Sequence, residues 1–168
     1  MTEVLRGRVF GKPRPEVVGA KAHLSEKYPA IAESVPAARS AVAGFAREAG
    51  MAKDRLEGIR LAVTEAVTNV VRHAYPGGQG CVAVTAGQAA DELWVLVADS
   101  GAGHQSRSPN PGLGFGLGII AHECDDLVIT ERAEGGTELR MSFQLKKKAG
   151  SGRSAVARRR QAGPASRR

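Results

Sequence analysis

Two polar side chains on one predicted helix, Glu65 and Asn69, have the spacing of a ligand-binding pair. They lie in the stretch LAVTEAVTNVVRHAY, residues 61–75, where valines recur at helical spacing and form an apolar stripe. Residues four apart lie one above the other on a helix, so this carboxylate and this carboxamide can share one ligand. The carboxylate can accept a proton, and the amide oxygen can bind a hard cation such as Mg²⁺. Solvated helix residues show the same spacing, so the pair alone leaves both interpretations open.

A second candidate is Asp99, which follows the apolar run LWVLVA (residues 93–98) and precedes Gly101 and Gly103. Glycine lets the backbone approach a flat ligand closely. A carboxylate at this point can accept a hydrogen bond from an exocyclic amine such as that of adenine. An ordinary Asp-Ser-Gly turn has the same sequence, so this motif also leaves both interpretations open.

A third candidate is the glycine-rich run GLGFGLG, residues 112–118, which opens a predicted helix. Free backbone amides at a helix N-terminus bind phosphate, although a Gly-rich hinge has the same composition. The chain contains no G-x-x-x-x-G-K-[ST] loop, and Leu117 and Ile119 fall where the dinucleotide fingerprint requires its last glycine. The sequence therefore excludes a Walker-type nucleotidase and a Rossmann dehydrogenase.

The elements that must position these residues follow from periodicity and from turn residues. We expect helices over 34–50, with Ser34 as the N-cap, over 53–75 and over 112–123. We expect strands over 22–28, 81–86, 93–98, 127–132 and 137–145, with Trp94 in the core. Helices grouped against a mixed, mostly antiparallel sheet predict an α+β fold, a two-layer α/β sandwich with about three helices on one face.

The charge of the chain is unevenly distributed. The net charge is +7, but nine basic residues and no acidic residue lie from Lys146 to the end, which leaves 15 basic against 17 acidic residues before it. We therefore expect a flexible arm over residues 1–20, a folded domain over 21–145 and a basic, disordered tail over 146–168.

The composition also limits the compartment. The sequence has no apolar run that would span a bilayer and no apolar segment of a signal peptide near its N-terminus. Cys81 and Cys124 lack the spacing of metal ligands, which favours free thiols in a reducing compartment. We expect a cytoplasmic protein with no membrane partner.

Taken together, the motifs occur in a specific order: E-x-x-x-N on a helix, D-x-G-x-G, G-x-G-L at a helix start and G-G-T before the last strand. In this order the chain resembles the GHKL family of ATPases and kinases over roughly residues 24–145. The segments SVPAAR (34–39) and EAVTNVVRHAY (65–75) are similar to its stand-alone members, the anti-sigma factor serine/threonine kinases.

The resemblance implies roles for individual residues. Asn69 would hold the Mg²⁺ that bridges the phosphates of ATP, and Glu65 would be the catalytic base that orients or deprotonates the attacking hydroxyl. Asp99 would bind the adenine amino group, and Gly101 and Gly103 would shape that pocket.

The remaining implied residues surround the same ligand. Gly114, Gly116 and Leu117, with the amides after them, would close over the phosphates, and Thr137 would lie close to Asp99 and the adenine. Arg107 would meet the γ-phosphate or be a solvated loop charge. His73 would help to close the end of its helix, and His104 and His122 have no metal partner at a recognised spacing.

The resemblance implies an ATP-binding anti-sigma factor, a homodimer that sequesters a sigma factor and phosphorylates an anti-sigma factor antagonist on Ser or Thr. A catalytically inactive ATP-binding regulatory module that controls a protein partner is the alternative. A histidine kinase fragment would need a dimerising hairpin, for which the roughly 30 residues before the first helix are too few. Nucleic acid would bind only non-specifically, through the basic tail.

Overall fold

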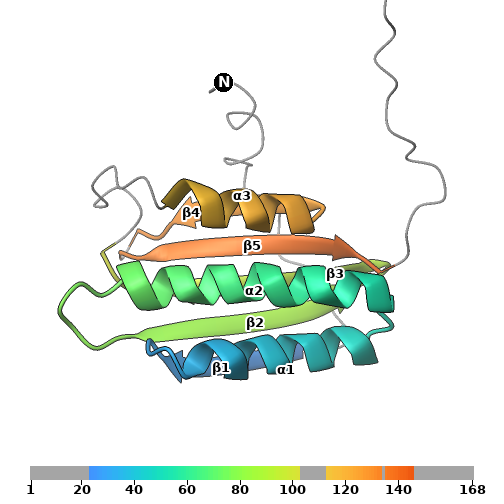
Figure 1. Cartoon of the computed structure of the whole chain (residues 1–168), viewed down its shortest axis with the longest axis horizontal. Coiled ribbons are helices and arrows are strands. Elements are labelled where there is room, and N and C mark those ends of the chain that lie inside the picture. The colour runs from blue at the N-terminus through green and yellow to red at the C-terminus, as the bar shows by residue number, and fades with distance from the viewer. Residues whose placement is uncertain (1–22, 103–112, 134, 146–168) are drawn as a thin grey trace, which may run out of the picture.

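The described part of the chain is an antiparallel sheet with helices on one face. The computed structural model describes residues 23–102, 113–133 and 135–145, and only the backbone of residues 113–115. The elements in chain order are β1 (His23–Pro29), α1 (Ser34–Glu48), α2 (Lys53–His73), β2 (Cys81–Ala89), β3 (Glu92–Asp99), α3 (Leu113–Glu123), β4 (Asp126–Glu131) and β5 (Thr137–Gln144). Figure 1 shows the helices side by side over the sheet. The predicted arm (1–20) and tail (146–168) lie outside the described residues.

The strand order places the ends of distant segments together. The sheet has the order β1-β2-β3-β5-β4, and all four pairings are antiparallel. The predicted α+β sandwich is confirmed, and the described strands contain no parallel pair. Strand β5 runs antiparallel to its neighbour β3, so Ala98 near the end of β3 pairs with Glu138 near the start of β5. Asp99 and Thr137 therefore lie at the same end of the sheet.

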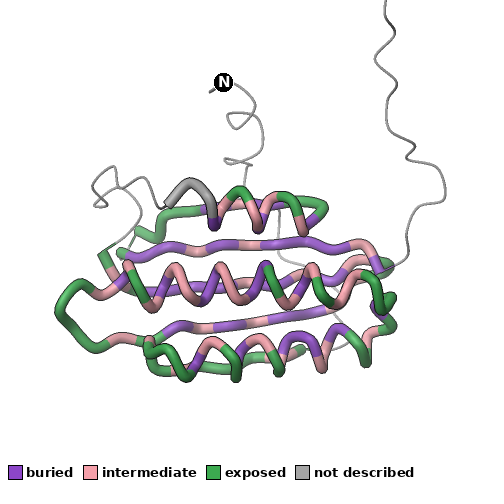
Figure 2. The backbone as a smooth tube through the Cα atoms, in the orientation of Figure 1, coloured by how far each residue is buried: buried purple, intermediate pink, exposed green. Residues whose placement is uncertain are grey.

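The core fills the space between the helices and the sheet. Alternate residues of β3 (Leu93, Val95 and Val97) are buried toward the helices, as the period of a strand requires. Central helix α2 packs between α1 and α3 and buries the stripe that its sequence predicted. Figure 2 shows these buried positions recurring along the helices and running along the strands. The largest fully buried side chains are Phe143, Ile59, Leu93, Ile120 and Met141.

The prediction that Trp94 lies in the core is wrong. Trp94 is half-buried and alternates with the core residues of β3, so it lies on the face of the sheet that the helices do not cover. Its indole lies over Gly87, its cross-strand neighbour, where a β-carbon would overlap the ring. The Arg140 guanidinium lies 5.8 Å from the ring centroid on the same face. The nearly continuous apolar run of β3 concealed this alternation.

The predicted capping role of Ser34 is also wrong. The N-cap of α1 is Glu33, with helical φ and ψ of −65° and −23° and no side-chain capping bond, and Ser34 is the first helical residue. A turn precedes the helix, in which the Ser34 amide donates to the Ile31 carbonyl at 3.1 Å and the Val35 amide to that of Ala32 at 3.2 Å. Because the backbone already satisfies these amides, no capping side chain is needed.

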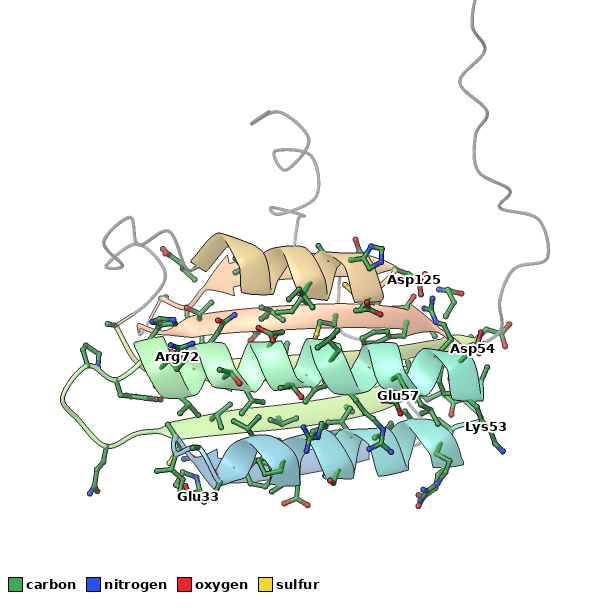
Figure 3. The ribbon with its side chains drawn as sticks, in the orientation of Figure 1. Glu33, Lys53, Asp54, Glu57, Arg72 and Asp125 are labelled. Carbon is green, nitrogen blue, oxygen red and sulfur yellow. The ribbon has the colours of Figure 1, made fainter. Side chains whose placement is uncertain are left out.

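The first turn of α2 is anchored to the far end of the sheet from Asp99. Arg55 pairs with the Asp125 carboxylate, which also accepts a hydrogen bond of 2.8 Å from the Gln144 amide. Figure 3 shows Asp125 at the same end of the molecule as Lys53 and Asp54. These contacts set the position of α2 relative to β5.

Two structural findings concern the cysteines and the possibility of a membrane-spanning helix. Both cysteines are free thiols, as predicted, with Cys81 exposed and Cys124 buried. Burial raises the pKa of the Cys124 thiol to about 11. Within the described ranges, no helix is long and apolar enough to cross a bilayer.

Candidate active site

The α2 residues Glu65 and Asn69 lie together, beside the first turns of α3. Both side chains are half-buried, because they flank the stripe of α2 that packs on the sheet. A β-carbon placed on Gly116 of α3 would lie 3.1 Å from Glu65 Oε2 and 3.5 Å from both Asn69 Oδ1 and Nδ2. The carboxylate and the carboxamide therefore converge on the same point, where a side chain at position 116 would contact both of them.

Asp99 ends β3 with its carboxylate inside the protein. The residue is 2% exposed, and Asp99 Oδ1 accepts a hydrogen bond of 2.9 Å from the Gly101 amide. The motif is thus a turn, the simpler of its two interpretations, and the turn also directs a buried carboxylate toward the core side of the sheet. A buried carboxylate needs hydrogen-bond donors, so a ligand with an N–H group would be favoured here.

Thr137 supplies a second polar group beside Asp99. The residue is 8% exposed, and its Oγ1 atom is buried without a hydrogen-bond partner among the described residues. A buried, unpartnered hydroxyl is rare in native proteins, so Thr137 Oγ1 is available to form a hydrogen bond with a ligand or a water. The predicted proximity of Thr137 to Asp99 is found in the structure.

A small cavity joins these groups. Its volume is about 30 Å³, and its polar lining residues are Asn69, Asp99 and Thr137. Leu117 of α3 and apolar side chains of α2 and the sheet complete the wall: Ala66, Val70, Val97, Ile129 and Leu139. Four predicted site residues from four different elements thus meet at one cavity.

The lining of the cavity fits an adenine ring, whereas its volume does not yet admit one. The walls are apolar and would suit a flat heterocycle, and the carboxylate and hydroxyl can pair with its amine and ring nitrogens. Pockets that hold ligands of this size usually measure roughly 300–1,000 Å³, so a nucleotide needs more room than the about 30 Å³ of this cavity. Leu117 is the lining residue contributed by α3, so the position of α3 contributes to the size of the cavity.

The turn after Asp99 is held from two sides. The Tyr75 hydroxyl accepts a hydrogen bond of 3.0 Å from the Ser100 amide, and the Ala102 amide donates to the Ala74 carbonyl at 2.8 Å. On the other side, Arg132 Nη1 donates to the Asp99 carbonyl at 3.3 Å. The turn is therefore fixed between the end of α2 and the β4–β5 hairpin.

Two glycines allow this close packing. A β-carbon on Gly101 would overlap the Ala74 carbonyl, and one on Gly136 would overlap the Asp99 carbonyl. Gly136 also has φ of +93°, which L side chains rarely adopt. Gly101 lets the turn lie directly against the end of α2, and its predicted role in shaping the adenine pocket stays a prediction.

Some predicted residues are not placed here. Gly103, Arg107 and His104 lie outside the described residues. Gly114 lies in the first turn of α3, of which only the backbone is described. His122 lies near the C-terminal end of α3, far along the helix from Gly116.

The structure adds residues that sequence reasoning missed, namely Tyr75, Arg132 and Gly136. Tyr75 had one signal, its place directly before Pro76 at the end of the predicted helix. Arg132 had no signal in the sequence, because its contact with Asp99 forms only when the β4–β5 hairpin folds back toward the end of β3. Figure 3 shows the corresponding end of α2, marked by Arg72.

No metal cage is present among the side chains of the described ranges, where no group of three or more His, Cys, Asp or Glu residues is close enough to hold an ion. Mg²⁺ in nucleotide sites commonly takes one or two protein oxygens and completes its shell with phosphates and water. The Asn69 carboxamide and the Glu65 carboxylate fit that limited contribution.

Comparison with known proteins identifies the family of this domain. The histidine kinase-like ATPase domain family matches residues 28–143. The serine-protein kinase RsbW of Bacillus cereus (strain AH187) is 43% identical over 75 residues, which are 45% of this chain and 47% of that protein. RsbW of Bacillus cereus (strain B4264) is 36% identical over 132 residues, which are 70% of this chain and 82% of that protein. The matched part thus spans about half the length of the first relative.

A solved structure shares the fold. The crystal structure of the RsbU and RsbW domains of Rv1364c from Mycobacterium tuberculosis matches with a TM-score of 0.60 and 22% identity, over 74% of this chain and 32% of that chain. The family match covers all three helices, β2, β3, β4, all but the last residue of β5, and every residue that lines the cavity. The chain therefore belongs to the histidine kinase-like ATPase domain family, the GHKL family, and within it is similar to the RsbW serine-protein kinases.

Proposed function

We propose that residues 21–145 form an ATP-binding protein kinase domain that transfers phosphate to a serine or threonine of a protein substrate. The single observation that carries this proposal is the meeting of Asn69, Asp99 and Thr137 at one cavity, with Glu65 one helical turn from Asn69. The similarity to RsbW serine-protein kinases supports the choice of a protein hydroxyl as acceptor.

Different residues of the site bind the adenine and the phosphates of the nucleotide. Asp99 and Thr137 hold the adenine, since they provide the buried acceptor and hydroxyl between apolar walls. Asn69 binds Mg²⁺, which neutralises phosphate charge when it is bound. Leu117 and the amides of the first turns of α3, including those of Gly114 and Gly116, cover the phosphates.

Glu65 acts as the general base. Its carboxylate lies on the same face as Asn69 and reaches the first turns of α3, where the phosphates would lie. From there it orients the attacking hydroxyl and accepts its proton as the new P–O bond forms and the bond to ADP breaks.

We further propose that the protein partners are a sigma factor, which the homodimeric protein sequesters, and an anti-sigma factor antagonist, which it phosphorylates in the cytoplasm. A groove of about 500 Å³ between α1 and α2 supports a protein partner, because Arg39 and Arg60 line it beside Leu61, which is 41% exposed. Both arginines are half-buried, and Glu57 lines the same groove and pairs with Arg60 at 3.4 Å, so the groove presents polar groups of both charges around Leu61 to a protein surface.

The test separates binding from transfer. The intact chain is incubated with ATP, Mg²⁺ and a candidate antagonist, and phosphorylation is followed as a mass increase of the antagonist. We expect Glu65→Gln to keep ATP binding and to slow transfer about 10²- to 10⁴-fold, the usual contribution of a general base. Exposed Glu48, at the C-terminal end of α1, provides the control, since Glu48→Gln should change neither quantity.

Two results would redirect the proposal. Equal transfer rates for Glu65→Gln and the unmodified protein would remove Glu65 from the mechanism. ATP binding without transfer to any candidate antagonist would favour the inactive regulatory module.

A further inference from the structure

The Tyr75 hydroxyl links the start of β2 to the turn that follows β3. Tyr75 Oη donates to the Cys81 carbonyl at 2.7 Å, at the start of β2, and accepts from the Ser100 amide at 3.0 Å, just after β3. The ring itself packs over Gly80, where a β-carbon would overlap it. A single oxygen thus connects the end of α2 to the residue that follows Asp99.

The opposite side of the same turn is held by Arg132. Its Nη1 atom lies 3.3 Å from the Asp99 carbonyl and 3.4 Å from Ser100 Oγ. Ser100 is therefore held through its amide by Tyr75 and through its hydroxyl by Arg132. Because Asp99 directly precedes Ser100, these contacts restrict the backbone from which the Asp99 carboxylate projects.

The carboxylate has little freedom of its own within this turn. The Gly101 amide fixes Asp99 Oδ1 at 2.9 Å, so the direction of the second oxygen follows from the position of the turn. A displaced turn would move that oxygen away from the amine of a bound base. Hydrogen-bond strength falls steeply as distance and angle depart from ideal values, so small displacements matter.

We propose that Tyr75, supported by Arg132, is a positioning residue that sets the preference of the site for adenine over other purines. The inference rests on the proposed nucleotide function. Tyr75 touches neither the base nor the phosphates and acts through Asp99. It also lies six residues after Asn69 on the same segment, so the end of α2 that carries the phosphate-binding residue also holds the base-binding turn.

The experiment compares ATP with ITP, whose hypoxanthine lacks the exocyclic amine that Asp99 would bind. Dissociation constants of both nucleotides with Mg²⁺ are measured by calorimetry for the intact chain, for Tyr75→Phe and for Tyr28→Phe. Phenylalanine keeps the ring that packs over Gly80 and removes only the bridging oxygen. Tyr28, the other tyrosine of the chain, lies on β1 and provides a matched control.

We expect the intact protein to prefer ATP, and Tyr75→Phe to weaken ATP binding about two- to tenfold, the range for loss of one exposed hydrogen-bonded group. ITP binding should change less, so the ATP-to-ITP preference shrinks, while Tyr28→Phe leaves it unchanged. Arg132→Gln should shift the preference in the same direction and carries the test if Tyr75→Phe does not fold.

The failures are distinguishable. If the intact protein binds no ATP, the proposed function fails and this inference fails with it. The inference alone is overturned if the intact protein prefers ATP and Tyr75→Phe weakens the binding of ATP and ITP by the same factor, or changes the binding of neither nucleotide. Either result is expected of a purely structural tyrosine, which would leave the ATP-to-ITP preference unchanged.

Discussion

Replacing Thr137 with valine should stabilise the nucleotide-free protein and weaken its binding of ATP. Valine has nearly the shape of threonine but lacks the hydroxyl. In the structure that hydroxyl is buried, and no described residue pairs with it. The substitution therefore removes a group that burial penalises in the free protein and that the ligand would satisfy.

The magnitude follows from the surroundings of the hydroxyl. An unsatisfied buried polar group costs about 1–3 kcal/mol. The adjoining cavity of about 30 Å³ has room for a water, which recovers part of that penalty, so the lower end of the range applies. We expect a gain in unfolding free energy of about 1 kcal/mol and, for a body of this size, a rise in Tm of about 4 °C.

The assay pairs thermal unfolding without nucleotide with calorimetric titration of ATP and Mg²⁺. Thr137→Val should raise Tm and weaken ATP binding about five- to tenfold, the effect of one lost hydrogen bond. Thr130→Val, at an exposed position of β4, is the control and should stay within about 0.5 kcal/mol of the unmodified protein. A lower Tm for Thr137→Val combined with unchanged ATP affinity would refute the reasoning, because it would mean that the hydroxyl is satisfied within the protein.

Two further predictions concern the backbone beside Asp99 and the buried thiol. Gly135→Ala and Gly136→Ala both place alanine at positive φ, +90° and +93°, but only the β-carbon at 136 overlaps the Asp99 carbonyl. Denaturant unfolding should therefore show a loss of about 1 kcal/mol for the first and about 3 kcal/mol or more for the second, and equal losses would contradict the close approach. At pH 8 an alkylating reagent should modify Cys81 and leave Cys124 unmodified until the protein unfolds, because burial raises the pKa of Cys124 to about 11. An unfolded thiol releases its proton near pH 8.5, so stability should fall between about pH 8.5 and 11 while the folded thiol stays protonated, and Cys124→Ala should flatten that decline.

Local patterns were sufficient to predict the elements of this fold. The apolar stripe around Val63 and Val67 predicted α2, and the glycine turns predicted the ends of the strands. Both kinds of pattern depend only on residues that are near one another in the sequence. The spacing of Glu65 and Asn69 gave their common face for the same reason.

The features that failed or were missed depend on distant residues. Trp94 was misplaced because a run of apolar residues does not reveal which alternate set faces the helices. Ser34 was misplaced because the preceding turn satisfies the backbone amides without a side chain. The holding of Asp99 by Tyr75 and Arg132 requires three segments to meet, which no local pattern encodes.

The small size of the cavity was also beyond the sequence. The motifs indicate which residues contact a nucleotide, but the position of α3 decides how much space they leave. Gly116 lies against Glu65 and Asn69, and Leu117 lines the base cavity, so the described position of α3 narrows both parts of the site. Any displacement of α3 that accompanies ATP binding would contribute its free energy to the measured affinity.

The most direct test of the account is calorimetric binding of ATP, with and without Mg²⁺, to the intact chain and to Asn69→Ala. Gln88→Ala removes an exposed carboxamide from β2, far along the strand from the site, and serves as the control. The account predicts binding that requires Mg²⁺, persists in Gln88→Ala and is lost in Asn69→Ala. Absence of ATP binding by the folded, intact chain, or equal binding by Asn69→Ala, would contradict it.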